Sequence, residues 1–307
     1  MDTNNTLDIP GATPLVSAII TTRNRLPLLK RAIESVFAQT YANIELIVVD
    51  DASTDGTKEY CKNQNLHYIS IPPHESRGGN YARNLGIKAA NGEYVAFLDD
   101  DDYWLHEKTS KQLALIQEHD CEMVHGGRTL EIINPDGTVT FRDLLPNPAH
   151  WGDMSKKILL TICTTTTTTI FAKRNALIET GLFDENLKFW QEYELTIRLA
   201  QRKPFYFVNE PVAVYRIDKN DSNRLTNKYF PWHEAVKYIH RKHRGLYKKL
   251  SFYEKFKVRR LVWSDAYERT AYAGLHVRHY MYLALLSLTS PSRVVNKLIK
   301  TLRHDNK

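Results

Sequence analysis

The first third of the chain alternates between short apolar runs and stretches whose apolar residues follow helical spacing. Residues 16–21, 44–49 and 94–98 are almost continuously apolar, which is typical of strands buried on both faces of a sheet. After the first run, Pro27 and the apolar positions up to Phe37 predict a helix. A further strand over 66–71 and a helix over 79–91 continue the alternation.

Alternation of strands and helices predicts an α/β fold, a mostly parallel sheet with helices on both faces. In such sheets, ligands bind beyond the carboxyl ends of the strands. Two of the expected strands end in acidic residues, one in Asp50 and Asp51 and the other in the run 99–102. We therefore expect both acidic groups to open into one crevice.

The remaining two thirds are less regular. Beyond residue 105 we expect helices over 106–119 and 190–201 and strands over 121–125, 164–171 and 205–216, and from about 228 onward the chain is predicted to be helical. The expected organisation is an N-terminal tail (1–13), a main domain (14–227, with halves 14–105 and 106–227) and a helical C-terminal region (228–307).

Composition supports a folded globular protein. Of 307 residues, 42% are hydrophobic and 25% charged, which excludes disordered and collagen-like chains. No apolar run approaches the roughly 20 residues that cross a bilayer, and the N-terminus has no secretory pattern. Three widely separated cysteines exclude a disulfide framework and a cysteine zinc site. We expect a cytoplasmic location.

Positive charge is concentrated at the C-terminal end. The formal net charge is +7, and residues 228–307 hold 18 Lys and Arg against 5 Asp and Glu. Aromatic residues are interleaved with the basic ones over 237–260. This pattern favours contact with an anionic membrane surface, while a solvated helical face and a nucleic-acid interface stay open as alternatives.

The four consecutive aspartates 99–102 indicate a metal site. Carboxylates this close raise one another's pKa unless a cation neutralises them. Their oxygens favour hard ions such as Mg²⁺ and Mn²⁺, whose coordination is often completed by phosphates of the ligand. The position after a buried strand favours a metal–diphosphate site over a solvated acidic loop.

The sequence at this point resembles a known family. VSAIITTRNR, then IELIVVDDASTDGT, then GGNYARNLGIKAANGEYVAFLDDDDYW are similar to the family 2 glycosyltransferases, which have the Rossmann-type GT-A fold. The match is strong over about 14–105 and traceable to about 220. The basic helical extension after it matches no family motif.

The resemblance implies roles for individual residues. Thr21, Arg23, Asp51, Arg83, Asp99 and Asp100 are the implied donor-binding residues. Asp51 corresponds to the carboxylate that accepts the imide N–H of uracil, and Asp100 to a ribose contact. Asp101 corresponds to the direct ligand of Mn²⁺ or Mg²⁺.

A later helix carries the implied catalytic base. Relatives have ED-x-DL-xx-RL where this chain has Gln191-Glu192-Tyr193-Glu194-Leu195-Thr196-Ile197-Arg198-Leu199, so Glu192 stands at the position of the catalytic aspartate. The extra methylene moves the carboxylate by about 1.5 Å. Trp190 and Glu194 are expected on the acceptor side, with a core role and an ion pair to Arg198 as their alternatives. The threonine run 164–169 lies where relatives have an acceptor-facing strand.

The resemblance implies an inverting, metal-dependent hexosyltransferase. We expect the donor to be a UDP-sugar, with glucose first and galactose, GlcNAc or GalNAc as alternatives. The implied acceptor is a polyprenyl-diphosphate-linked sugar in O-antigen, lipopolysaccharide or capsule biosynthesis, reached by peripheral binding to the inner face of a bacterial cytoplasmic membrane. A nucleic-acid-binding protein and a catalytically silent sugar-binding relative are alternatives. The acidic crevice argues against nucleic acid.

Overall fold

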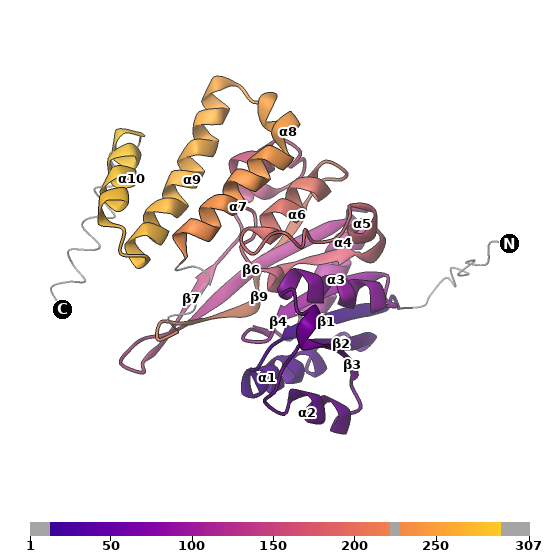
Figure 1. The fold of residues 1–307 in the computed structure, drawn as a ribbon. Helices are drawn as coiled ribbons and strands as arrows, with labels where there is room; N and C mark the ends of the chain where they lie inside the picture. Colours follow the sequence, from indigo (N-terminus) through magenta and orange to yellow (C-terminus); the bar gives the residue numbers. More distant parts are fainter. Residues whose placement is uncertain (1–12, 222–227, 290–307) are drawn as a thin grey trace.

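The computed structural model describes residues 13–221 and 228–289. The expected tail, apart from Thr13, and the end of the C-terminal region lie outside these residues. A single twisted sheet runs through the molecule, with helices on both of its faces and a group of helices at one end (Figure 1).

Within the described residues, nine strands form the sheet. Their spatial order is β3-β2-β1-β4-β8-β6-β9-β5, and β7 pairs with β6. The strands are β1 (Val16–Thr22), β2 (Ile44–Asp51), β3 (His67–Ile71), β4 (Tyr94–Asp99), β5 (Tyr103–Trp104), β6 (Met123–Ile133), β7 (Val139–Leu144), β8 (Phe171–Lys173) and β9 (Tyr206–Asp218). The first four are mutually parallel. The predicted mostly parallel α/β sheet is therefore confirmed for residues 14–105.

The helices cover both faces because strand side chains alternate in direction. The helices are α1 (Leu26–Phe37), α2 (Thr57–Asn63), α3 (Gly79–Ala89), α4 (Lys108–Glu118), α5 (Arg174–Glu179), α6 (Gln191–Ala200), α7 (Tyr229–Lys242), α8 (Arg244–Lys248), α9 (Phe252–Tyr272) and α10 (His276–Thr289). Ala18 and Ile20 of β1 enter the core beneath α1, α2 and α4. Ile19, between them, enters the other core, beneath α3 and α6.

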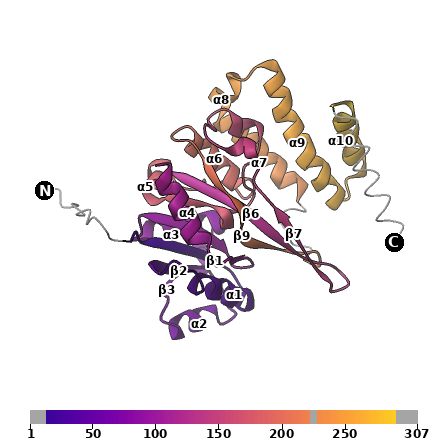
Figure 2. The same ribbon diagram turned by 180° about the vertical axis from the view of Figure 1, so that it is seen from behind.

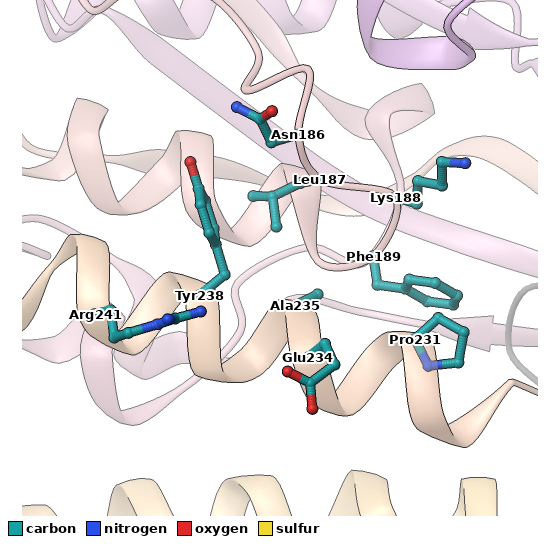
Figure 3. A pocket seen from close by; sticks show the side chains of 9 residues that line it. All are labelled: Asn186, Leu187, Lys188, Phe189, Pro231, Glu234, Ala235, Tyr238 and Arg241. Atoms are coloured by element: carbon teal, nitrogen blue, oxygen red, sulfur yellow. The ribbon is translucent and has the colours of Figure 1, made fainter.

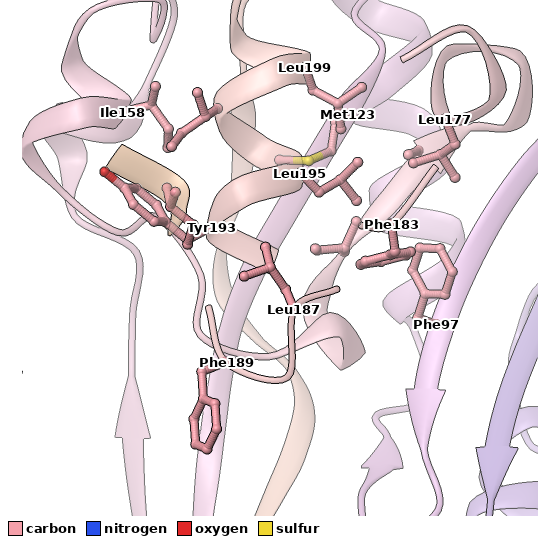
Figure 4. Close-up of a cluster of buried hydrophobic side chains, with 14 of the residues drawn as sticks. Phe97, Met123, Ile158, Leu177, Phe183, Leu187, Phe189, Tyr193, Leu195 and Leu199 are labelled. Carbon is pink, nitrogen blue, oxygen red and sulfur yellow. The ribbon is translucent and has the colours of Figure 1, made fainter. Parts of the chain in front are cut away.

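The larger core joins the sheet to the C-terminal helices. Phe97, Met123 and Leu195 lie in this cluster, part of which Figure 4 shows. Trp232 of α7 and Val258 of α9 belong to the same cluster, so the helices after residue 228 pack onto α6 and the loops around it (Figure 2). Burying this apolar surface holds the basic region against the rest of the fold.

Two expectations about secondary structure are wrong. The strand expected over 164–171 is restricted to β8, and Thr167–Thr169 form a turn of 3₁₀ helix (η4) instead. The cause is local hydrogen bonding: the Thr166 hydroxyl accepts from the Thr168 backbone N–H, and such side-chain bonds compete with strand pairing. The strand expected over 121–125 continues as far as Ile133, because it pairs with both β7 and β9.

No helix within 13–221 and 228–289 combines the length and the apolar character needed to span a membrane.

Candidate active site

The carboxyl ends of three parallel strands bring the acidic residues together. In the sheet register Thr22 of β1 lies beside Asp50 of β2, and Thr21 lies beside Asp99 of β4. The Thr22 hydroxyl donates to Asp100 across 2.8 Å. Both acidic groups, residues 50–51 and 99–102, therefore lie at one edge of the sheet, where an α/β fold places its ligands. We call this edge the acidic edge.

Asp100 and Asp101 share a single guanidinium. Arg25 Nη1 lies 3.2 Å from Asp100 Oδ1 and 3.0 Å from Asp101 Oδ2. Burial and the neighbouring charge of Asp101 raise the pKa of Asp100 to about 6 despite this pairing. Burial and Asp99 likewise raise the pKa of Asp101. The carboxylates at this edge therefore carry more negative charge than the neighbouring arginine side chains neutralise.

The flanking aspartates are held by the threonine turn. Asp99 accepts a hydrogen bond from Arg83 Nη2 at 2.6 Å and from Thr167 Oγ1 at 3.1 Å. Asp102 is fully buried and accepts from Thr168 Oγ1 at 2.6 Å. The threonine run is therefore a support for the acidic run. In the sequence this run is typical of a strand, and nothing in it predicted that its hydroxyls support the acidic residues.

Asp50 and Asp51 have different surroundings. Asp50 accepts from the Ser53 backbone N–H at 2.9 Å and from the Tyr68 hydroxyl at 2.6 Å, so it braces the turn after β2. Asp51 is buried, and among the described residues its Oδ1 atom has no hydrogen-bond partner. Arg23 Nη1 lies 3.8 Å from the other oxygen. An unpartnered carboxylate oxygen is available to an N–H donor of a ligand.

Glu192 lies at the first turn of α6, facing the acidic edge. Its exposed fraction is 8%, and burial raises the pKa of its carboxyl to about 7, although the charge of Arg83 opposes this shift. Gln191 Nε2 donates to Glu192 Oε1 across 3.0 Å. Arg83 is attracted electrostatically by both Asp99 and Glu192. The buried Arg83 guanidinium thus pairs with Asp99 and lies within electrostatic reach of Glu192.

Trp190 and Glu194 are turned toward the C-terminal helices. Trp190 Nε1 donates to Asp265 at 3.0 Å, and its ring packs edge-on against Trp232. Glu194 is fully buried and is bonded to Arg198, Lys242 and His243. These contacts match the ion pair to Arg198 that is the alternative for Glu194, while Trp190 stays partly exposed. They join α6 to α7 and α9.

The acidic edge fits a divalent cation that is held together with a ligand. Within the described residues no group of three or more His, Cys, Asp or Glu side chains is arranged to hold a metal ion. Mg²⁺-type ions commonly use one or two protein carboxylates and take their other ligands from substrate phosphates. Asp101, beside Asp100 and paired only with Arg25 among the described residues, has the donor chemistry for such an ion.

A separate groove lies next to the segment that leads into α6. It has a volume of about 380 Å³ between residues 186–189 and α7, with Leu187, Phe189 and Pro231 among its walls (Figure 3). No residue of the acidic edge lines it. Residues 186–189 lead directly into Trp190 and α6, so the groove adjoins the predicted site without belonging to the donor side.

Sequence comparison identifies relatives over the first two thirds of the chain. The family model described as Glycosyl transferase family 2 matches residues 17–187. TuaG of Bacillus subtilis, named for teichuronic acid biosynthesis, is 31% identical over 216 residues, covering 67% of this chain and 81% of TuaG. WfaP of Escherichia coli, a UDP-Glc:alpha-D-GlcNAc-diphosphoundecaprenol beta-1,3-glucosyltransferase, is 36% identical over 143 residues, covering 46% of this chain and 56% of WfaP.

Not every match covers the relative's full length. An uncharacterized glycosyltransferase of Rickettsia bellii is 31% identical over 219 residues, which are 70% of this chain and only 30% of that protein. The chain thus spans about a third to about half of some of the curated relatives it matches.

Solved structures share the fold. TarS of S. aureus in complex with UDP-GlcNAc superposes with a TM-score of 0.58 at 18% identity, covering 91% of this chain and 82% of that chain. The mannosyltransferase PcManGT from Pyrobaculum calidifontis in complex with GDP-Man and Mn²⁺ gives 0.59 at 17% identity, covering 97% and 82%. At these identities the likeness concerns the fold alone, which is of the GT-A type.

Proposed function

The chain belongs to glycosyl transferase family 2, and from this premise we propose that it is an inverting transferase that moves a hexose from a UDP-sugar to a hydroxyl of a lipid-linked glycan. Glucose from UDP-glucose is the favoured donor, with galactose, GlcNAc and GalNAc as alternatives. The observation that carries the proposal is the meeting of the acidic edge and Glu192 around Arg83. This brings a diphosphate-binding region next to a candidate base.

Asp51 supports a uracil nucleotide. The imide N–H of uracil is a hydrogen-bond donor, and Asp51 Oδ1 is a buried acceptor without a partner among the described residues. Thr21, near the end of β1, and Arg23, just after β1, lie at the same edge and are proposed to contact the base or ribose. TarS, which has the same fold, binds UDP-GlcNAc.

The diphosphate is proposed to lie against Asp99, Asp100 and Asp101. A Mn²⁺ or Mg²⁺ ion held by Asp101 would offset the negative charge of the departing diphosphate. The structural neighbour PcManGT was determined with Mn²⁺ and a nucleotide sugar. Arg83, hydrogen-bonded to Asp99 at 2.6 Å, is proposed to fix the donor-side carboxylate.

Glu192 is proposed to act as the general base. Its carboxylate takes the proton of the acceptor hydroxyl while the hydroxyl oxygen attacks the anomeric carbon from the side opposite the diphosphate. The bond from that carbon to the diphosphate oxygen breaks, UDP leaves, and the configuration inverts. A pKa near 7 suits a base that works near neutral pH.

The relatives favour a lipid-linked acceptor. WfaP acts, by its name, on a GlcNAc-diphosphoundecaprenol, and TuaG is named for teichuronic acid biosynthesis. We propose an acceptor of the same class, a sugar on a polyprenyl diphosphate, in the assembly of a bacterial surface polysaccharide.

The last helix supports binding to an anionic membrane surface. Val277, Tyr280, Met281 and Leu288 of α10 are exposed by 86%, 65%, 47% and 83%, and their spacing places them on one helical face. The C-terminal region that includes α10 is strongly basic in sequence, with 18 Lys and Arg against 5 Asp and Glu over 228–307. An apolar stripe with flanking cations is typical of helices that lie in the membrane interface.

Flotation with anionic liposomes tests the membrane contact. Wild-type protein should float at low salt and less at high salt, and the double variant V277D/L288D should remain in the pellet fraction. Phe37 on α1, exposed by 66%, supplies the matched control F37D, which should float like wild type. Equal flotation of all three would exclude α10 as the contact.

The transfer reaction is tested by a panel of UDP- and GDP-sugars supplied with a synthetic GlcNAc diphosphate on a prenyl chain, with Mn²⁺ or Mg²⁺. We expect transfer from a UDP-hexose and loss of transfer after chelation with EDTA. Transfer from GDP-sugars alone would contradict the role given to Asp51.

A further inference from the structure

Among the described residues, five arginines near the carboxyl edge of the sheet pair with carboxylates, and a sixth arginine nearby does not. The five ion pairs are Arg23–Asp51, Arg25–Asp100, Arg31–Glu131, Arg83–Asp99 and Arg216–Asp218. The sixth is Arg128. Over the described residues its side chain forms no hydrogen bond and no ion pair within 4.0 Å, and its buried Nε atom has no partner.

Arg128 nevertheless lies within electrostatic reach of Asp102 and Glu192. Burial lowers the pKa of its guanidinium, while Tyr215, Asp102 and Glu192 attract the charged form. Its guanidinium carbon lies 5.8 Å from the centroid of the Tyr215 ring. A partly buried cation without a carboxylate in contact is costly for the folded protein, and an anionic ligand at the same place would remove that cost.

The backbone of β6 is built to present this side chain. The register of β6 with β9 shifts between Gly126 and Gly127 and again between Gly127 and Arg128. A Cβ atom on Gly127 would lie 2.9 Å from the Glu210 carbonyl oxygen and 3.0 Å from that of Leu144. Only glycine therefore fits the irregularity, and such bulges redirect the side chains that follow.

We propose that Arg128 is an anion-binding residue that receives a phosphate group of a diphosphate substrate between the acidic edge and Glu192. This inference rests on the proposed function, which includes two substrates that carry a diphosphate: the nucleotide-sugar donor and the prenyl-diphosphate acceptor. A guanidinium suits this task because its planar N–H groups match two phosphate oxygens.

Calorimetric titration of Arg128→Gln and Arg128→Lys tests the proposal with three probes: Mn²⁺–pyrophosphate, Mn²⁺–UDP and farnesyl diphosphate. Arg128→Gln should weaken at least one of them by about tenfold or more, as the loss of a charge-assisted hydrogen bond implies, and Arg128→Lys should recover part of it. Arg142 on β7, which is exposed and lies beside Leu130 in the register, supplies the control Arg142→Gln, which should bind like wild type.

The probes separate the two sources. Loss confined to Mn²⁺–UDP and Mn²⁺–pyrophosphate assigns Arg128 to the donor, and loss confined to farnesyl diphosphate assigns it to the acceptor. Unchanged binding of all three by Arg128→Gln overturns the proposal, as does wild-type protein that binds none. If the proposed function were wrong instead, pyrophosphate binding would still depend on Arg128, but no nucleotide sugar would serve as a donor.

Thermal unfolding distinguishes a binding role of Arg128 from a structural one, because the two roles predict different changes in melting temperature. Arg128→Gln removes a charge that lacks a partner among the described residues, so its melting temperature without ligand should equal or exceed that of wild type. A marked drop in melting temperature, together with unchanged binding, would make Arg128 a packing residue.

Discussion

Asp99 and Glu192, far apart in the chain, face the same buried guanidinium, that of Arg83. Arg83 Nη2 donates to Asp99 Oδ1 across 2.6 Å, and its charge acts on both carboxyls. Asp99 is the last residue of β4, and Glu192 is the second residue of α6. A substitution at either carboxyl should therefore change the electrostatic environment of the other.

Substituting Glu192 by Gln should abolish base catalysis and spare donor binding. We expect turnover to fall at least about 100-fold, because general-base help is worth roughly 10²–10⁴-fold, with Mn²⁺–UDP affinity within about twofold of wild type. Steady-state kinetics and calorimetry measure the two. Glu118→Gln, an exposed change on α4, is the control, and turnover retained by Glu192→Gln would remove Glu192 from the role.

The pH profile of turnover should show an acid limb near pH 7. A base works only when ionised, and burial raises the pKa of Glu192 to about 7. Turnover should therefore rise with pH up to about 7 and level off above it. A limb near pH 4.5, the ordinary range of a glutamate, would mean that this carboxyl does not limit the rate.

Stability should depend on pH through the same group. The folded-state pKa of Glu192 lies above its unfolded value, so its favourable contribution is complete below about pH 4.5 and is lost as the pH rises through about 7. Glu192→Gln should gain stability relative to wild type between pH 5 and 8. Urea unfolding at pH 5 and at pH 8 measures this gain. A difference in unfolding free energy between the variant and wild type that is the same at both pH values would contradict the buried placement of Glu192.

Asp101→Asn should remove metal-dependent donor binding. If Asp101 holds the ion, Mn²⁺ should no longer increase the affinity for UDP, whereas metal-free UDP binding should change little. Titrations with and without Mn²⁺ give the comparison. Asp143→Asn on β7, an exposed carboxyl, serves as the control; a full Mn²⁺ effect in Asp101→Asn would place the ion elsewhere.

Asp51→Ala should weaken UDP but not pyrophosphate. Loss of a hydrogen bond to a charged acceptor corresponds to about tenfold or more in affinity, and Mn²⁺–pyrophosphate has no base for Asp51 to contact. Equal losses for the two ligands would indicate a general disturbance of the edge, and no loss would remove Asp51 from base recognition.

Glu194→Gln should lower stability without a specific effect on the site. Glu194 is fully buried, and the removed charge leaves Arg198, Lys242 and His243 without their shared carboxylate. Breaking such a pair costs about 3 kcal/mol or more. Burial opposes ionisation, but hydrogen bonds from His243 and Arg198 hold the pKa of Glu194 at about 2, so the difference from wild type should shrink as the pH falls below about 4.5.

The sequence by itself determined the parallel half of the fold and its acidic edge. Continuous apolar runs specify strands buried on both faces, and the carboxyl ends of parallel strands meet at one edge, so Asp51 and Asp99 could be brought together from pattern alone. Helical spacing likewise located α1 and α6. These features depend on local periodicity, which a single sequence contains.

Only the tertiary structure decided which side chains contact one another. The threonines after residue 163 have the β propensity of a strand, yet their hydroxyls bond to Asp99 and Asp102 instead. Glu192 and Glu194 are two residues apart on one helix, but one faces the acidic edge and the other a cluster of cations from α6, α7 and the turn after α7. Arg128 follows a register shift between β6 and β9, and its buried Nε atom has no hydrogen-bond partner among the described residues. Contacts across the fold fix such environments, and no spacing along the chain encodes them.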